Sequence, residues 1–372
     1  MNRSASPPTE PGSLALLAEL YDELLPHFSS RQFNVGCDET WDLGQGKSKA
    51  ACAARGTGRV YLDFLLQIHG LVQRHGRTMQ FWGDIINQHP DLIPELPDGI
   101  VALEWGYEAK HPFDTHGAAY AAAGVPFYVC PGTSSWNAIA GRTDNARGNL
   151  WNAAEHGLAH GAIGYLNTDW GDGGHWQPLP ASFLGLAYGA AVSWAASPNR
   201  DLDLPRALDL HAFHDNNGVM GRAVYDLGNA YLEPGSLVHN SSALSLLMQY
   251  PERSPGEMGL SIDGLERARA RIAGATADLG RAKMARSDAD LIVREVANAA
   301  GLLDHACKLG IARLETPGGD IAGIPAGTRQ ALAAELEGLI ADYRALWLAR
   351  SRPGGLDDSA GQLEGLLKLY RA

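Results

Sequence analysis

Five short apolar segments, each followed by a helical pattern, occupy residues 14–195, and this alternation limits the fold more than any other feature of the sequence. The five strand-like segments are RQFNVGCDE, TMQFWGDI, IVALEWGYE, VPFYVCPG and AIGYLNTDWGDGG. Between the first two, apolar residues recur with helical spacing at Val60, Phe64, Ile68 and Leu71. Alternating strands and helices predict a parallel sheet, either a (β/α)-barrel or an open doubly wound sheet.

Polar and aromatic residues stand at the carboxyl end of every expected strand. They are Asp38 and Glu39, Trp82 and Asp84, Trp105 and Glu108, the PGTSSWN loop, and Trp170 and Asp172. Barrel enzymes carry their chemistry on that rim. No glycine-rich nucleotide loop follows any of these strands, so the barrel is the favoured prediction.

The composition changes at ASPNRDLDLP, around residues 196–206. Beyond it we expect only helices, near 263–278, 287–308, 327–350 and 359–371. We therefore expect two domains, a partial (β/α)-barrel catalytic domain over 1–198 and a helical region over 199–372.

Charge and apolar runs exclude several classes of protein. The formal net charge is −12 without a basic run, which argues against nucleic acid and anionic membranes as partners. No uninterrupted apolar stretch reaches 18 residues, and MNRSASPPTEPG lacks the features of a signal peptide. The four cysteines lack C-x-x-C spacing, so we expect reduced thiols in a cytoplasmic protein.

The adjacent carboxylates of Asp38 and Glu39 are the sharpest candidate for chemistry. Two acidic residues at the end of an apolar strand are costly to bury unless they are hydrogen-bonded or functional. On a regular strand they would point to opposite faces, so both reach one site only if the chain leaves β geometry, which Gly36 makes easier. The alternative is a pair at the start of a surface loop.

Tryptophan and aspartate share i, i+2 spacing at Trp82 and Asp84 and again at Trp170 and Asp172. On a strand each pair projects to one face and combines an aromatic wall with a hydrogen-bond acceptor. A sugar ring needs that combination. The alternative is a core tryptophan beside an aspartate that caps a turn.

Other patterns are weaker. GQGKS at 44–48 lacks the first glycine of a phosphate-binding loop, and no G-x-S-x-G motif occurs. His156 and His160 have the i, i+4 spacing of two metal ligands on one face of a helix. Without an obvious third ligand, a solvated helix face is the favoured interpretation. We therefore expect neither a metal ion nor another cofactor.

The segment FNVGCDETWDLGQG at 33–46 resembles the (H/N)-(I/V)-G-x-D-E strand of glycoside hydrolase family 20, particularly its cytosolic hexosaminidase D-like branch. The segments FWGD, LEWGYE, YVCPGTSSWN and NTDWGDGGH look like later strand ends of the same (β/α)8 barrel. The resemblance spans roughly residues 14–195.

The resemblance implies retaining, substrate-assisted hydrolysis of terminal β-linked N-acetylglucosamine or N-acetylgalactosamine, an exception to the two-carboxylate scheme. The 2-acetamido oxygen of the substrate attacks the anomeric carbon. Glu39 would protonate the leaving oxygen and then deprotonate water, whereas Asp38 would accept the acetamido N–H. A glycosidase with two protein carboxylates is a further possibility.

The resemblance also implies a sugar site. Trp82, Trp105 and Trp170 match an aromatic box, and Asp172 stands where an acidic residue binds the outer hydroxyls. Asp84 is expected beside them. Many relatives carry Tyr-x-Asp after the fourth of these strands. This chain has Trp136 and Asn137 there, so Tyr128 is the other candidate for the acetamido contact.

The first three strands of the family barrel, with an arginine that grips the ring hydroxyls, have no counterpart in the 30 or so residues before the motif. We therefore expect only the last five βα units, whose two open edges would need a cover such as a second copy of the chain. Val35, Phe81 and Leu103 are candidates for barrel-facing side chains. A non-catalytic, sugar-binding remnant is the alternative function.

Overall fold

The computed structural model describes residues 7–372. Residues 1–6, where the first half of the segment assessed for a signal peptide lies, are outside the described residues. The described chain forms two compact units. Unit 1 contains the residues up to Gly106, His111–Pro131 and Asn152–Leu166, and unit 2 contains Tyr107–Lys110, Gly132–Trp151 and Asn167–Ala372.

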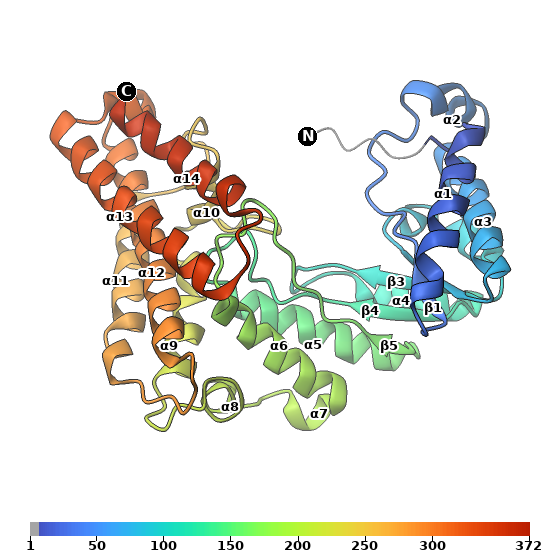
Figure 1. The fold of residues 1–372 in the computed structure, drawn as a ribbon, viewed down its shortest axis with the longest axis horizontal. Helices are drawn as coiled ribbons and strands as arrows, with labels where there is room; N and C mark the ends of the chain where they lie inside the picture. Colours follow the sequence, from blue (N-terminus) through green and yellow to red (C-terminus); the bar gives the residue numbers. More distant parts are fainter. Residues whose placement is uncertain (1–6) are drawn as a thin grey trace. The chain divides into compact units, whose positions relative to one another are not determined.

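Unit 1 contains a five-stranded parallel sheet in the order β1-β2-β3-β4-β5 (Figure 1). The strands are β1 (Gln32–Asn34), β2 (Thr78–Trp82), β3 (Ile100–Trp105), β4 (Phe127–Cys130) and β5 (Gly164–Tyr165). Phe81 pairs with Ala102, and Leu103 with Tyr128. The sheet is curled into a half-barrel. An incomplete α/β barrel is thereby confirmed, whereas the full (β/α)8 assignment stays a prediction.

Helices cover one face of this sheet. They are α1 (Pro11–Leu24), α3 (Thr57–Arg74), α4 (Phe113–Ala123) and the second half of α5 (Thr143–Ala159), whereas α2 (Lys49–Arg55) packs on α3. Helix α3 buries Tyr61, Leu65 and Ile68 against the sheet because these residues recur at helical spacing. Helix α4 ends at Gly124, whose φ of 69° is the left-handed conformation that favours glycine.

The core between sheet and helices corrects one expectation about side-chain direction. Phe81 is fully buried in this core and Val35 packs against it, so both face the helices and not the barrel interior. Leu103 follows Ala102, which belongs to the same core, and therefore projects to the opposite face. Of the three candidates for barrel-facing side chains, Val35 and Phe81 were therefore wrong, because successive residues of a strand point to opposite faces.

The two edges of the sheet are formed by β1 and β5. The first and the last of the five strands thus form the two open edges that a sheet of five βα units was expected to have. Both edge strands are short, with three and two residues. Short edges offer few unpaired backbone groups to a second strand.

Unit 2 is helical. Its helices are the first half of α5, α6 (Leu179–Trp194), α7 (Ala196–Asn199), α8 (Leu204–Leu208), α9 (Met220–Leu227), α10 (Ala243–Gln249), α11 (Ile262–Thr276), α12 (Ala289–Leu314), α13 (Ala326–Arg350) and α14 (Leu356–Arg371). Helices α11 to α14 pack successively against one another (Figure 1). The expected helices near 263–278, 287–308, 327–350 and 359–371 are confirmed.

The compact units interleave along the sequence, whereas the expected domains follow one another. The division into a catalytic domain over 1–198 and a helical region over 199–372 remains a proposal about how the chain is organised.

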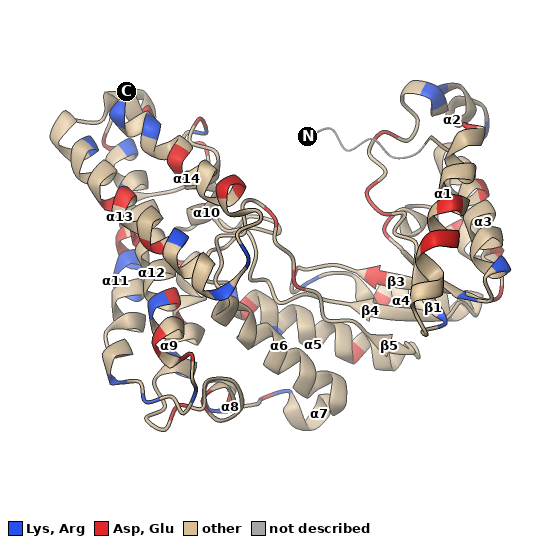
Figure 2. Cartoon of the chain, viewed as in Figure 1, with Lys and Arg blue, Asp and Glu red and all other residues tan. Residues whose placement is uncertain are grey.

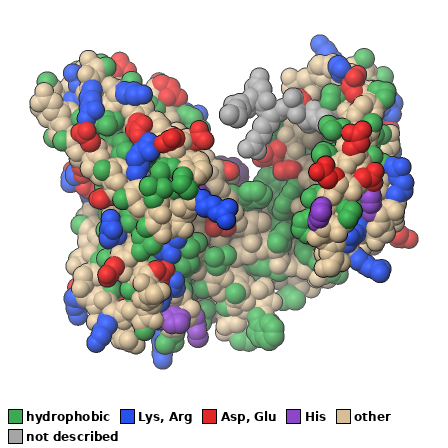
Figure 3. Space-filling view, in the orientation of Figure 1, with side chains coloured by type: hydrophobic (Ala, Val, Ile, Leu, Met, Phe, Trp, Pro, Cys, Tyr) green, Lys and Arg blue, Asp and Glu red, His purple; other side chains and the backbone are tan. Residues whose placement is uncertain are grey.

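None of the helices in residues 7–372 combines the length and hydropathy needed to cross a bilayer. Lys and Arg are interspersed with Asp and Glu along α11 to α14 (Figure 2). On the face shown in Figure 3, acidic, basic and apolar side chains are likewise mixed. The expected absence of nucleic acid partners stays a prediction.

Candidate active site

The chain leaves strand geometry directly after β1, at the segment that carries Asp38 and Glu39. Backbone pairing with β2 continues to Gly36, whose carbonyl accepts the Trp82 N–H at 3.0 Å. Gly36, Cys37 and Glu39 then have φ values of 77°, 69° and 49°. Left-handed backbone is uncommon for residues other than glycine and clusters at functional sites. The alternation that would send the two carboxylates to opposite faces is therefore broken here.

Asp84 ties this segment to the neighbouring strand ends. Its Oδ2 accepts the backbone N–H of Glu39 at 3.0 Å, and its Oδ1 accepts the indole N–H of Trp105 at 3.3 Å. Burial raises the pKa of Asp84 from 3.8 to about 6, against the lowering effect of these hydrogen bonds, and the charge of Asp38 adds to the rise. The structure thus brings together Asp38, Glu39, Asp84 and Trp105 from the ends of three consecutive strands.

Asp38 and Glu39 have different surroundings although they are adjacent. Asp38 is half-buried and lines a cavity of 530 Å³ together with Cys37 and apolar side chains of α1 and α3. Burial, and then the charges of Asp38 and Asp84, raise the pKa of Cys37 to about 12. Glu39 is exposed. Of the two adjacent carboxyl groups, that of Glu39 is therefore the one open to solvent.

Trp82 and Tyr128 lie on the sheet face away from the helices. In β2 the buried Phe81 faces the helices, so Trp82 projects to the other side. The hydroxyl of Tyr128 accepts a hydrogen bond of 3.2 Å from the amide of Gln32 in β1. Because β1 and β4 are not neighbours in the sheet, this contact follows from its curl. The expected contact between Tyr128 and an acetamido group stays a prediction.

In unit 2 the predicted site residues Trp170 and Trp136 meet at Tyr107. The indole N–H of Trp170 donates to the Tyr107 hydroxyl at 2.9 Å. The ring of Trp136 packs edge-on against Tyr107, with centroids 4.9 Å apart. Trp170 is 39% exposed and Trp136 only 1%. Trp136 therefore supports Tyr107 in this structure, and direct contact between Trp136 and a sugar stays a prediction.

Asn137 and the loop of Asp172 are also neighbours in unit 2. A Cβ atom at Gly173 would lie 2.2 Å from the Oδ1 of Asn137, and Gly173 has a φ of 62°. Only glycine fits this close approach. The backbone carbonyl of Asn137 accepts hydrogen bonds from Ser241 and Ser242. Asp172 itself is exposed beside Gly173.

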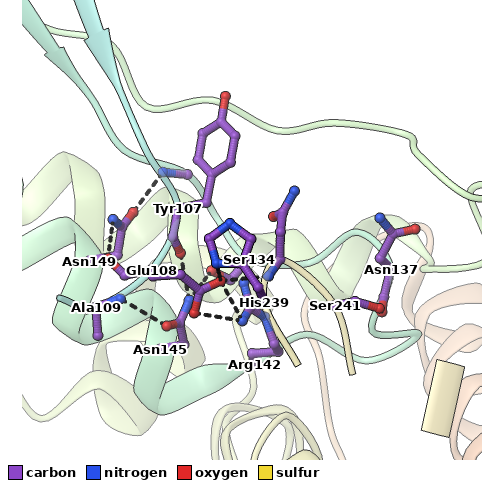
Figure 4. A network of polar contacts seen from close by, with 12 residues as sticks. Tyr107, Glu108, Ala109, Ser134, Asn137, Arg142, Asn145, Asn149, His239 and Ser241 are labelled. Atoms are coloured by element: carbon purple, nitrogen blue, oxygen red, sulfur yellow. Dashed lines mark hydrogen bonds and ion pairs between the residues drawn. The ribbon is translucent and has the colours of Figure 1, made fainter. Parts of the chain in front are cut away.

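Sequence reasoning missed the polar network that holds Tyr107 (Figure 4). Arg142, 2% exposed, donates from Nη1 to both carboxylate oxygens of Glu108 at 3.0 and 3.1 Å. Asn145 donates to the carbonyl of Tyr107 at 2.6 Å and accepts the N–H of Ala109 at 2.9 Å. The side chains of the loop and of α5 therefore fix the backbone on both sides of Glu108. No local motif signals this pairing, because Glu108 and Arg142 are 34 residues apart.

No protein-family model matches the chain. A stretch of 119 residues is 27% identical to hexosaminidase D of Homo sapiens and covers 30% of this chain and 24% of that protein. The chain thus matches about a quarter of the length of this relative. Among solved structures, a GH138 enzyme targeting pectin rhamnogalacturonan II aligns with a TM-score of 0.46 and 12% identity, over 92% of this chain and 48% of that one. The chain is distantly similar to a hexosaminidase, which suggests a carbohydrate-related function.

Proposed function

We propose that the chain is a glycoside hydrolase of family 20 that removes terminal, non-reducing β-linked N-acetylhexosamine from glycosides, with Glu39 as the acid. The observation that carries this proposal is the turn after β1, which Asp84 anchors and which presents Glu39 to solvent beside Asp38. The distant similarity to a hexosaminidase supports the same class of substrate.

In the proposed mechanism the substrate supplies the nucleophile. Its acetamido oxygen attacks the anomeric carbon while Glu39 gives a proton to the departing glycosidic oxygen. Asp38 accepts the acetamido N–H and stabilises the positive charge of the oxazolinium intermediate. Glu39, now ionised, removes a proton from water, which opens the intermediate with retained configuration.

The aromatic residues have separate proposed roles in the two units. In unit 1, Trp82 and Trp105 offer indole faces to a sugar, and the contact with Asp84 fixes the ring of Trp105. In unit 2, the Trp170 indole offers a partly exposed face that Tyr107 holds in place.

Replacement of Glu39 tests the acid directly. Glu39→Gln keeps the shape of the side chain but cannot donate the proton, so hydrolysis of a substrate with a poor leaving group should fall about 10²–10⁴-fold. An aryl glycoside with an activated leaving group should lose less. Glu23→Gln, at an exposed position of α1 in the same unit, is the matched control. Equal losses on both substrates would show that Glu39 is not the acid.

The role of the substrate as nucleophile has its own test. A thiazoline mimic of the oxazolinium should inhibit competitively, and Asp38→Asn should weaken that inhibition. An active preparation that the thiazoline leaves uninhibited would instead use two protein carboxylates.

A non-catalytic sugar-binding protein is the second candidate. The contact that favours it is Trp170 on Tyr107, which holds an aromatic face without any help from Glu39. Titration with N-acetylglucosamine, followed by tryptophan fluorescence, distinguishes the two. Binding without turnover of any N-acetylhexosaminide supports this candidate, and turnover excludes it.

A further inference from the structure

Glu104, His111 and His116 form a second cluster in unit 1 that the proposed hydrolysis does not use. Glu104 lies in β3, His111 in the following loop and His116 in the first turn of α4. One oxygen of Glu104, Oε1, lies 2.7 Å from His111 Nε2 and 2.7 Å from His116 Nδ1. The potential ligand atoms of all three side chains lie within 4.8 Å of one another. Strand, loop and helix thus aim three ligand-type groups at one point.

The three side chains of the cluster differ in how deeply they are buried. The Glu104 side chain is 1% exposed, whereas those of His111 and His116 are 19% and 26% exposed. Glu104 is therefore a fixed group on the rigid strand, and the two imidazoles close over it from the solvent side. The solvent side of the cluster is thus formed by the two partly exposed imidazoles.

Gly106 gives His111 the room to reach Glu104. A Cβ atom at Gly106 would lie 2.0 Å from the Nδ1 of His111. No real side chain tolerates that distance, so the approach of the ring depends on glycine at this position.

One polar atom beside the cluster lacks a hydrogen-bond partner among residues 7–372. Asn87 donates to Oε2 of Glu104, while its own carbonyl oxygen is buried without a hydrogen bond. Buried polar groups without partners are rare in native proteins and often mark a water or ion. The oxygen of Asn87 would reach the cluster after rotation of the amide, since its nitrogen already lies 3.4 Å from His116 Nδ1.

We propose that Glu104, His111 and His116 bind a divalent transition metal ion, with zinc as the best match. One carboxylate and two imidazoles form a common zinc ligand set that leaves a fourth position for water or the amide oxygen of Asn87. Tetrahedral zinc with bonds of about 2.0–2.2 Å keeps its ligands about 3.3 Å apart. The imidazoles would therefore withdraw from Oε1 by about 0.6 Å, which a loop residue and a first-turn residue can accommodate.

The ion would lie on the opposite side of β3 from the proposed site. Glu104 and Trp105 are consecutive in the strand and project to opposite faces. Asn87 follows Asp84 by three residues in the same loop and short helical turn, η3 (Ile86–Gln88). A bound ion would thus stiffen the segments that carry Trp105 and Asp84, in a structural role.

The competing explanation is a metal-free charge cluster. Burial alone would raise the pKa of Glu104, but the hydrogen bonds from His111 and His116 outweigh it and hold that pKa below its usual value. In this case the histidines would serve only to stabilise the buried carboxylate, and the chain would not retain zinc.

Zinc titration of the full chain against a chromophoric chelator distinguishes the two explanations. The wild type should bind one zinc ion in competition with the chelator. His111→Gln and His116→Gln should each weaken zinc binding by at least about 100-fold. Loss of a residue that only hydrogen-bonds to a metal ligand costs up to about 100-fold in affinity, and loss of a ligand itself should cost no less. Cobalt in place of zinc should give the visible absorption of a tetrahedral site, and this absorption should be lost in the same variants.

A second group in unit 1 provides the matched control. Asp114, His156 and His160 also bring three ligand-type groups together, but the Asp114 side chain is 64% exposed. Asp114 is thus the third ligand-type neighbour that the sequence did not reveal for His156 in α5 and for His160 directly after it. His160→Gln should leave the tight zinc site unchanged.

Thermal unfolding completes the test. Zinc should raise the Tm of the wild type and of His160→Gln but not that of His116→Gln, because only binding to the folded state stabilises it. Circular dichroism in chelator checks that the variants are folded. Absence of zinc uptake by the wild type, or loss of tight binding in His160→Gln instead of His116→Gln, would overturn the proposal.

Discussion

At Asp84 a single carboxylate accepts hydrogen bonds from the Glu39 backbone and the Trp105 indole, while burial raises its pKa to about 6. The sequence predicted Asp84 as a sugar-binding residue from its spacing to Trp82. The spacing could not reveal the contact with Glu39, which depends on how the chain turns after β1. This turn needs two left-handed residues other than glycine, and no local propensity predicts them.

The raised pKa of Asp84 predicts a particular pH dependence of stability. The folded protein holds a proton on Asp84 more tightly than the unfolded chain, whose value is near 3.8. Ionisation of Asp84 therefore destabilises the folded state as the pH rises through about 6. Asp84→Asn removes this ionisation, so its Tm relative to the wild type should be higher at pH 8 than at pH 4.5.

Circular dichroism melts at the two pH values provide the measurement. The loss of an acceptor in Asp84→Asn shifts Tm equally at both, so only the difference between them reports the ionisation. Asp91→Asn, at an exposed position in the same unit, should show no such difference. A Tm difference for Asp84→Asn that does not change with pH would contradict the prediction.

At the scale of elements, the sequence predicted all five strands and the long helices of unit 2. The strands were predictable because apolar runs such as IVALEW end in polar residues, and α12 and α13 because their apolar spacing persists over many turns. The short helices α8 and α10 were missed, since 5 and 7 residues hold too few turns to show a period. The predicted directions of the Val35 and Phe81 side chains were wrong for a different reason. Large side chains lie on both faces of β1 and β2, so the sequence does not show which face packs against the helices.

Substitution by alanine should have opposite effects on stability at two helical glycines, one in α6 and one in α13. A Cβ atom at Gly185 in α6 would lie 2.5 Å from the backbone of Thr133, whereas Gly338 in α13 has nothing within 4 Å. Gly185→Ala should therefore destabilise the fold by about 1–3 kcal/mol through overpacking. Gly338→Ala should stabilise it by about 0.5–1 kcal/mol, because alanine favours the helix.

Urea unfolding of both variants gives these free energies. Since the same substitution is made in two helix interiors, helix propensity contributes equally to both. A Gly185→Ala variant as stable as Gly338→Ala would mean that α6 does not pack on Thr133 as described.

At the scale of the whole molecule, the open sheet predicts self-association. Near the β5 edge, Ile163 is 60% and Leu158 72% exposed, and both are large apolar residues. A second copy that covers this edge would bury these two apolar side chains and remove them from water. We expect a dimer whose light-scattering mass halves on dilution.

Ile163→Lys tests whether this edge is the interface. A charge beside an edge strand opposes pairing, so the variant should be monomeric at concentrations where the wild type is dimeric. Leu348→Lys, at another exposed apolar position, 55% exposed and in α13, should remain dimeric. A wild type that is monomeric at every concentration would contradict the predicted dimer.

The shared carboxylate of Asp84 also restricts how such a protein can evolve. Asp84 accepts hydrogen bonds from both the Glu39 turn and the Trp105 ring. A substitution at Asp84 therefore changes how much a second substitution, at Trp105 or in the turn, affects the protein. Substitutions at Trp105 and in the turn should then be epistatic, with effects that add only when Asp84 is absent. Lineages that lose one of the three positions would be released from selection on the other two, so these positions should be lost together.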